Sequence, residues 1–228
     1  MDPRWLRALN AGQDFAAGKG PVTYLENHDH MTVTLVAGGR DRWYRVRPYL
    51  IALYTCPGAV LVNNGQEFGR SEYMPEPGQD GNLPPDQKRV RPRPLHWNQA
   101  DDATGRLVRD QYAFLARLRR EHPALRTSTF YPDAYDERWT HFSPEGYGVD
   151  VDRQVVIYHR WGPAPGAGQE RFLIVLNFSG SDQAVDVPFP GNGPWRDLLN
   201  GGQVQVDHFW LRDVRVTSNW GCAFCQKS

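Results

Sequence analysis

The chain has 228 residues, and its 26 lysines and arginines are balanced by 26 aspartates and glutamates. Because nucleic acids and anionic membranes are bound largely through an excess of basic residues, this neutral balance argues against both as partners. The 40% of hydrophobic residues allows a buried core, and a count of only three cysteines excludes a disulfide scaffold. The length fits one large domain or two unequal ones.

The sequence has no pattern of a membrane span or a secretory signal. Its longest apolar run, residues 50–62, contains Pro57 and Gly58 and is too short to cross about 30 Å of hydrocarbon. Charged residues interrupt the first 18 positions, where a secretory signal needs a continuous apolar stretch. These features predict a cytoplasmic location.

The first 70 residues alternate between helix and strand patterns. We expect a short helix over residues 3–10, a strand over 22–25, a helix over 41–54 and a second strand over 59–62. Both strands are apolar along their length, which is typical of parallel strands that are buried on both faces. A right-handed crossover should connect them.

The rest of the chain begins with a proline-rich segment, residues 70–100, that has no periodicity and predicts a long surface loop. Residues 104–121 then show helical spacing, with acidic capping residues before them and Pro123 after them. From about residue 127, short β-prone runs alternate with turns at the spacing of a β-sandwich. These runs are residues 154–158, 171–176, 184–187 and 204–206.

Polar residues follow each of the two strands predicted in the first part of the chain. Asn27, His28 and Asp29 come after the first strand, and the tip Gly65-Gln66-Glu67 comes after the second. In parallel α/β proteins functional groups gather at the carboxyl ends of the strands, because the loops there vary while the sheet stays rigid. The two tips therefore predict a functional site.

The segments around these tips resemble the α-amylase family of glycoside hydrolases, family 13. They read VTYLENHDH at 22–30, LIALYTCPGAVLVNNGQEFG at 50–69, RPRPLHW at 91–97 and YAFLARLRREHPALR at 112–126. The resemblance implies an α/β part followed by an all-β part: residues 1–126 would carry strands 7 and 8 of a (β/α)₈ TIM barrel with their helices. Residues 127–228 would form an antiparallel β-sandwich, which FLIVLNFSG at 172–180 supports.

The same resemblance implies a glycosidase that acts on α-glucosidic bonds of starch- or glycogen-like glucans, including maltooligosaccharides, by a retaining mechanism. Asp29 would be the third catalytic carboxylate, which hydrogen-bonds sugar hydroxyls and stabilises an oxocarbenium-like transition state, and His28 and Asn27 would bind the same sugar. The family's nucleophile and acid/base come from its fourth and fifth strands. We expect them to be absent here, so activity would need a missing N-terminal barrel section or a partner chain.

Other roles compete with these at the two tips. Glu67 is expected to make structural hydrogen bonds, and His30 is expected to be a loop residue beside the sugar site. A minor alternative pairs Asp29 with Glu67 as two glycosidase carboxylates on neighbouring parallel strands. The shared motifs leave open whether the activity is hydrolysis, transglycosylation or isomerisation.

An alternative from a different class is a non-catalytic glucan-binding or accessory module. Its sandwich and its tryptophans would hold sugar without hydrolysing it, with Trp161, Trp195 and Trp210 as candidates. The arginines of the proline-rich loop are expected to form a solvated positive segment. They are Arg89, Arg91 and Arg93.

The sequence predicts no cofactor and no metal site. Cys222 and Cys225 have the spacing of half a zinc site, but a second pair of ligands at matching spacing is lacking, and a frayed C-terminal tail is expected there. Asp150 and Asp152 do not lie in a dense acidic loop of the kind that binds calcium.

Overall fold

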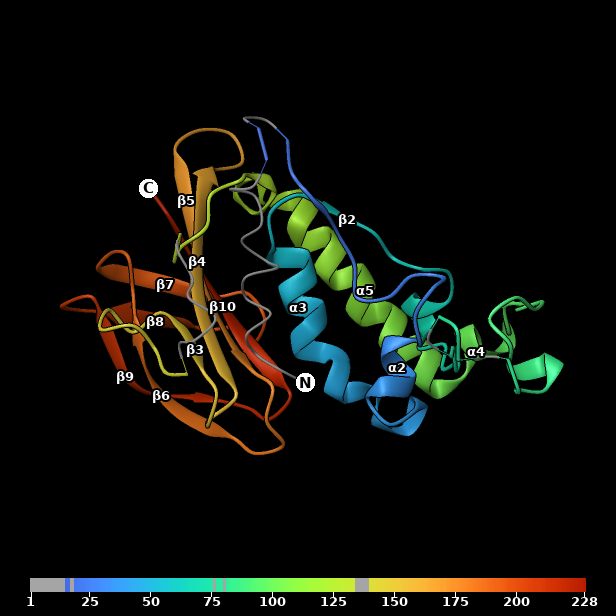
Figure 1. The fold of residues 1–228 in the computed structure, drawn as a ribbon. Helices are drawn as coiled ribbons and strands as arrows, with labels where there is room; N and C mark the ends of the chain where they lie inside the picture. Colours follow the sequence, from blue (N-terminus) through green and yellow to red (C-terminus); the bar gives the residue numbers. More distant parts are fainter. Residues whose placement is uncertain (1–14, 17–18, 76, 80, 134–139) are drawn as a thin grey trace.

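The computed structural model describes residues 15–16, 19–75, 77–79, 81–133 and 140–228. Strands of the second half form a β-sandwich, and the helices of the first half pack against one of its faces (Figure 1). The helix predicted over residues 3–10 lies outside the described residues. Among the described residues, no helix has the length and apolar character needed to cross a membrane.

Two helices connect the first half of the chain to the sandwich. Helix α3 (Arg47–Thr55) lies between the sheet and the long helix α5 (Ala103–Glu121), as Figure 1 shows. The predicted helix over 41–54 is only partly right, because residues Arg40–Val46 form the kinked 3₁₀ segment η3 and α3 begins at Arg47. Pro48, which lacks an N–H, fits in the first turn of α3, where that donor has no partner within the helix.

The prediction for α5 is confirmed in position and in the way the helix begins. The side chain of Asp102 accepts a hydrogen bond of 2.7 Å from the backbone N–H of Gly105, which satisfies one of the unpaired donors of the first turn. At the other end, the buried guanidinium of Arg119 donates to the backbone oxygens of Tyr54 and Cys56, at 2.9 and 2.8 Å. The end of α3 is thereby tied to α5.

Strands β1 (Val22–Thr23) and β2 (Ala59–Val60) form a two-stranded parallel sheet, with Val22 opposite Ala59 and Thr23 opposite Val60. The parallel pairing confirms the prediction, but the strands are shorter than expected and are not buried on both faces. Val22 is 56% exposed and Tyr24 is 43% exposed. A two-residue strand with one neighbour has too few covering elements to bury its apolar side chains.

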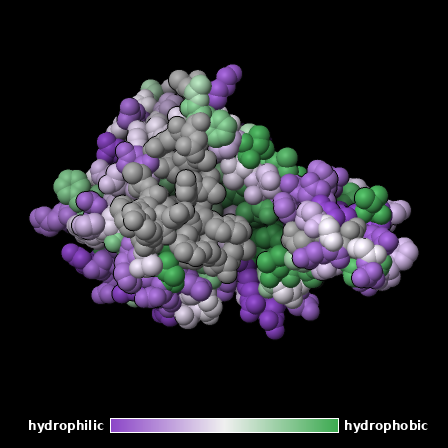
Figure 2. Space-filling model, in the orientation of Figure 1, coloured by the Kyte–Doolittle hydropathy of each residue, from purple (hydrophilic) through white to green (hydrophobic). Residues whose placement is uncertain are grey.

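Short elements punctuate the segment between β2 and α5. They are η4 (Gln66–Phe68), η5 (Pro85–Gln87) and α4 (Asn98–Asp101). One more short helix, α2 (Val33–Val36), lies earlier in the chain, between β1 and η3. The predicted surface loop over 70–100 is confirmed as mostly irregular chain. In Figure 2 hydrophobic atoms, in green, reach the surface over this helical half. The exposed large hydrophobic residues of this half include Val36, Tyr44, Leu61, Val90, Trp97 and Leu107.

After α5 and the 3₁₀ turn η6 (Pro123–Arg126), the chain forms a six-stranded antiparallel sheet in the order β3-β4-β5-β10-β7-β8 and a two-stranded sheet of β6 and β9. The bounds of these strands are β3 Gly148–Asp150, β4 Val155–Pro163, β5 Gln169–Asn177, β6 Gln183–Pro188, β7 Gly193–Asp197, β8 Gln203–Val206, β9 Trp210–Val216 and β10 Trp220–Lys227.

The prediction of a frayed C-terminal tail is wrong. Residues 220–227 form β10, an inner strand that pairs with β5 over its whole length and with β7 near Phe224. Its side chains alternate between two cores: Cys225 packs in the cluster shared with the helices, and Cys222 packs in the cluster between the two sheets. Because both sheet faces are covered, the strand is apolar on both, and the segment lacks the alternation that marks a half-buried strand.

A fully buried arginine closes the junction between the helical half and the sandwich. Arg160 of β4 donates to the backbone oxygens of Thr55, Thr127 and Thr129, which come from the end of α3 and from the segment leading into the sandwich. Burial lowers the pKa of its guanidinium to about 10, so the group stays charged at neutral pH. The predicted division at residue 126/127 stays a prediction, since α3 and the sheet share one core.

Candidate functional site

The polar loop that follows β1 presents two exposed side chains. The backbone N–H of Asp29 donates to the side-chain oxygen of Asn27 at 2.8 Å, which closes a local turn. The side chains of His28 and Asp29 are 87% and 54% exposed, and the imidazole lies 3.5 Å from the carboxylate. The loop therefore exposes an imidazole and a carboxylate at the surface.

The loop is anchored by Glu26, which is almost completely buried. Its carboxylate accepts hydrogen bonds from the backbone N–H of Val33 at 2.6 Å and from the amide of Asn63 at 3.3 Å. Asn63 lies just beyond β2, so this one side chain ties the tip of β1 to the tip of β2. Burial raises the pKa of the Glu26 carboxyl to about 7, against the opposing effect of the Val33 hydrogen bond.

The tip after β2 turns sharply into η4. Gly65 has a φ of +87°, and a Cβ there would lie 2.9 Å from the Cδ of Arg70, so only glycine fits without displacement. The side-chain oxygen of the buried Gln66 accepts from the backbone N–H of Asn63 at 3.1 Å. Glu67 is placed in this turn with partial exposure, and its expected structural role stays a prediction.

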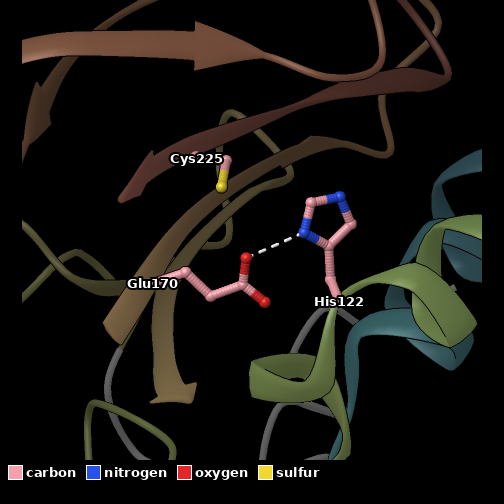
Figure 3. A group of neighbouring side chains, drawn as sticks. All are labelled: His122, Glu170 and Cys225. Atoms are coloured by element: carbon pink, nitrogen blue, oxygen red, sulfur yellow. Dashed lines mark hydrogen bonds and ion pairs between the residues drawn. The ribbon is translucent and has the colours of Figure 1, made fainter. Parts of the chain in front are cut away.

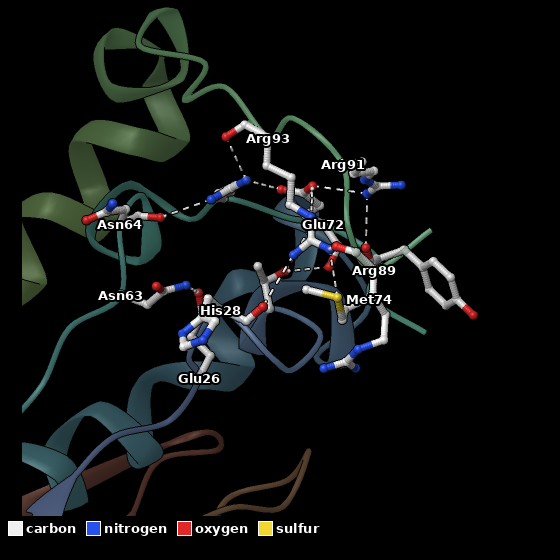
Figure 4. A network of polar contacts seen from close by, with 12 residues as sticks. Glu26, His28, Asn63, Asn64, Glu72, Met74, Arg89, Arg91 and Arg93 are labelled. Carbon is white, nitrogen blue, oxygen red and sulfur yellow. Dashed lines mark hydrogen bonds and ion pairs between the residues drawn. The ribbon is translucent and has the colours of Figure 1, made fainter. Parts of the chain in front are cut away.

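Four arginines and Glu72 hold the two tips in place (Figure 4). The Glu72 carboxylate forms ion pairs with Arg70, with Arg91 at 3.0 Å and with Arg93 at 3.4 Å. Arg89 pairs with the Asp29 carboxylate at 3.0 Å and also donates to the Asp29 backbone oxygen at 3.1 Å. The proline-rich segment thus folds back onto the loop that carries His28 and Asp29.

The expectation of a solvated positive segment is wrong for these arginines. The side chains of Arg89, Arg91 and Arg93 are only 18%, 14% and 17% exposed. The physical reason is that Glu72 and several backbone oxygens accept hydrogen bonds from these arginines in place of water. The spacing of charged residues in the sequence does not reveal these acceptors. Arg93, for example, also donates to the backbone oxygen of His28 at 3.4 Å.

Two cavities flank this network. The smaller one, about 150 Å³, is lined in part by Asn27, His28, His30, Asn63 and Asn64. The larger one, about 540 Å³, is lined in part by Arg70, Glu72, Arg91, Arg93 and His96. Asn27, His28 and His30 therefore share one cavity, and Asp29 lies beside it through its contacts with His28 and Arg89.

Sequence reasoning missed Glu26 and Glu72, the two carboxylates that organise the site. For Glu26 the sequence signal is its position directly before Asn27, in the polar run that follows the first strand. For Glu72 the sequence offers no local signal, because its partners lie up to about twenty residues away in an irregular segment.

The tryptophans that were candidates for sugar contact differ in exposure. Trp195 is completely buried in the core between the two sheets, so it is wrong as a surface contact, and Trp161 and Trp210 are partly buried. Trp97, at the end of the proline-rich segment, is 65% exposed, and its ring centroid lies 5.9 Å from that of Phe68 in η4. This indole lies in the same half of the molecule as the two tips.

Comparisons with known proteins identify relatives of the sandwich and of most of the chain. Residues 148–224 match the family model described as alpha amylase, C-terminal all-beta domain. The 1,4-alpha-glucan branching enzyme GlgB of Rhodopseudomonas palustris is 31% identical over 170 residues, which is 70% of this chain and 19% of the relative. The GlgB of Rhodococcus jostii is 32% identical over 165 residues, 68% of this chain and 18% of the relative.

Solved structures extend the fold match to almost the whole chain. The protein AmyP, solved in complex with maltose, superposes with a TM-score of 0.70 at 17% identity over 98% of this chain and 44% of its own. The maltogenic alpha-amylase AmyB from Thermotoga neapolitana gives 0.62 at 17% identity over 100% of this chain and 46% of its own. This chain spans about a fifth of the length of the curated relatives. The chain carries the C-terminal all-β domain of the α-amylase family at residues 148–224, and 70% of it is similar to a 1,4-alpha-glucan branching enzyme.

Proposed function

We propose that this chain supplies the seventh and eighth strands of a (β/α)₈ barrel, together with the terminal sandwich, to a protein that acts on α-glucosidic bonds of starch- or glycogen-like glucans. The parallel register of β1 and β2 supports this placement. So does the exposure of Val22, Tyr24 and Leu61, apolar side chains on or beside the two strands that neighbouring barrel elements would cover.

The observation that carries the proposal is the polar loop held at the carboxyl ends of two parallel strands. Arg89 pairs with one carboxylate oxygen of Asp29, and His28 approaches the other. Asp29 would accept hydrogen bonds from sugar hydroxyls, and these bonds strengthen as positive charge develops on the ring in the transition state. His28 and Asn27 would contact the same sugar, with His30 at the edge and Glu67 in a supporting role.

A retaining glycosidase needs a nucleophilic carboxylate and a carboxylic acid about 5 Å apart. In the proposed arrangement both come from earlier barrel strands or from a partner chain, and Asp29 acts beside them as a stabiliser of the transition state. The relatives named as 1,4-alpha-glucan branching enzymes and the structure of AmyP with maltose support an α-glucan as the substrate class. They leave open whether the bond is hydrolysed or transferred.

A second candidate function, a non-catalytic glucan-binding module, is favoured by the exposed indole of Trp97. A flat aromatic surface of this kind packs against the apolar face of a sugar ring. In this arrangement the chain would hold a maltooligosaccharide through Trp97, and the Asn27–Asp29 loop would contribute little to binding.

Release of reducing sugar from soluble starch and maltoheptaose by the purified chain tests the first proposal. The expected result is no release above that of Asp29→Ala, which also exposes contaminating amylase. Release that Asp29→Ala abolishes would overturn the assignment of the cleaving carboxylates to another part of the protein. It would instead favour the pair Asp29 and Glu67 as the cleaving groups.

A further inference from the structure

Three potential metal ligands converge where the end of α5 meets the sandwich. His122 ends α5, Glu170 lies on β5 and Cys225 lies on the neighbouring strand β10, and their side chains point toward one another in Figure 3. The ligand atoms of the three residues all lie within 4.8 Å of one another. His122 Nδ1 is hydrogen-bonded to a Glu170 carboxylate oxygen at 2.9 Å.

We propose that His122, Glu170 and Cys225 form a binding site for a divalent transition-metal ion of the zinc class, with water as the fourth ligand. An imidazole nitrogen, a carboxylate oxygen and a thiolate sulfur are the three donor types that zinc takes from proteins. Calcium and magnesium prefer oxygen ligands, so the sulfur and nitrogen donors select against them.

The spacing of the three donors suits a tetrahedral site after small rotations. Bonds of about 2.0 Å to nitrogen and about 2.3 Å to sulfur place the ligand atoms of such a site about 3.5 Å apart. The 2.9 Å separation of His122 and Glu170 would widen and the largest separation, 4.8 Å, would shorten. The first change is about 0.6 Å and the second about 1.3 Å for the bond lengths of a zinc site, which side-chain torsions at the edge of the core can supply.

Burial and charge favour an ion at this position. The Glu170 side chain is completely buried and Cys225 is 7% exposed, while His122 keeps a 12% exposed edge through which an ion could enter. Without a metal, the Glu170 carboxylate and a Cys225 thiolate would repel each other, because their ligand atoms lie within 4.8 Å of one another. A divalent ion would convert that repulsion into attraction.

The charges balance when the ion is bound. One divalent ion with one thiolate, one carboxylate and one neutral imidazole gives a net charge of zero, which suits a largely buried site. Binding would release the thiol proton, and any proton on the imidazole, to the solvent. The ion would then connect the end of α5 to β5 and β10, two inner strands of the six-stranded sheet.

The test is titration of the metal-free chain, purified without a histidine tag, with Co²⁺ as a spectroscopic substitute for Zn²⁺. We expect one Co²⁺ per chain with a sulfur-to-cobalt charge-transfer band, which Zn²⁺ displaces. Cys225→Ser should abolish the band, and His122→Gln should weaken binding at least tenfold.

The matched control is Cys222→Ser, because Cys222 lies on the same strand and is similarly buried but faces the other core. It should keep the band, and circular dichroism in chelator should confirm that each variant is folded. Zn²⁺ should raise the melting temperature of the wild type and Cys222→Ser but not of Cys225→Ser.

Absence of stoichiometric binding to the folded wild type, or a band that survives Cys225→Ser, would overturn the proposal. Because the test uses no glucan, its outcome is independent of the proposed function.

Discussion

The buried carboxyl of Glu26 makes a prediction about the pH dependence of stability. Its pKa is about 7 in the folded chain against an ordinary value of 4.5. The folded state therefore binds the proton more tightly than the unfolded state, and stability falls as pH rises from 4.5 to 7. The loss is complete above pH 7 and amounts to about 3 kcal/mol, of which about 2.5 kcal/mol falls between pH 5 and pH 8.

The perturbation is Glu26→Gln, which keeps the shape of the side chain and removes the titration. The glutamine oxygen can still accept from Val33, while its amide nitrogen would oppose the amide of Asn63 unless that amide turns over. This effect is independent of pH, so it shifts the stability of the variant by a constant. The free energy of unfolding of the variant minus that of the wild type should therefore rise by about 2.5 kcal/mol from pH 5 to pH 8.

The assay is urea-induced unfolding at pH 5, 6, 7 and 8, with thermal melts as a second readout. A change of this size corresponds to about 5–10 °C in melting temperature for a chain of this length. Asp101→Asn is the control, since that carboxylate is 83% exposed and should give a difference that does not vary with pH. A flat or falling difference for Glu26→Gln would refute the assignment of a buried, protonated Glu26.

Three further substitutions test the packing around the site and the junction. Arg160→Met should lower the free energy of unfolding by about 3–5 kcal/mol in urea titrations, because it leaves one buried and two partly buried backbone oxygens without this donor; a loss below 1 kcal/mol would contradict these hydrogen bonds. Asp102→Ala should cost about 1 kcal/mol through the lost cap on Gly105, and unchanged stability would count against the cap. Glu72→Gln should leave the surrounding arginines without their shared anion and speed amide exchange in residues 27–32, whereas unchanged exchange would show that this loop does not depend on Glu72.

Much of the fold follows from local sequence patterns. Helix α5 was predictable because its apolar stripe, its Asp102 cap and Pro123 all act within a few residues of one another. The parallel pair β1 and β2 was also predictable, from two apolar runs separated by a helix. Strand β10 was not, because a strand covered on both faces has no alternation and its partner β5 lies about fifty residues earlier.

In the candidate site too, one part could be predicted from the sequence and another part could not. The exposed loop of Asn27, His28 and Asp29 can be recognised from sequence because its residues are adjacent. The burial of Arg91 and its pairing with Glu72 depend on how an irregular segment folds back, which no period or cap encodes. The triad of His122, Glu170 and Cys225 is harder still to predict, since three separate elements bring it together.

The central claim, that the Asn27–Asp29 loop contacts an α-glucan, is tested most directly by calorimetric titration of the chain with maltoheptaose. The wild type and the control Asp101→Ala should bind alike, and Asp29→Ala should weaken binding at least tenfold, because it removes a charged acceptor of sugar hydroxyls. Equal binding by all three, with a loss only in Trp97→Ala, would contradict the claim and favour the accessory-module function.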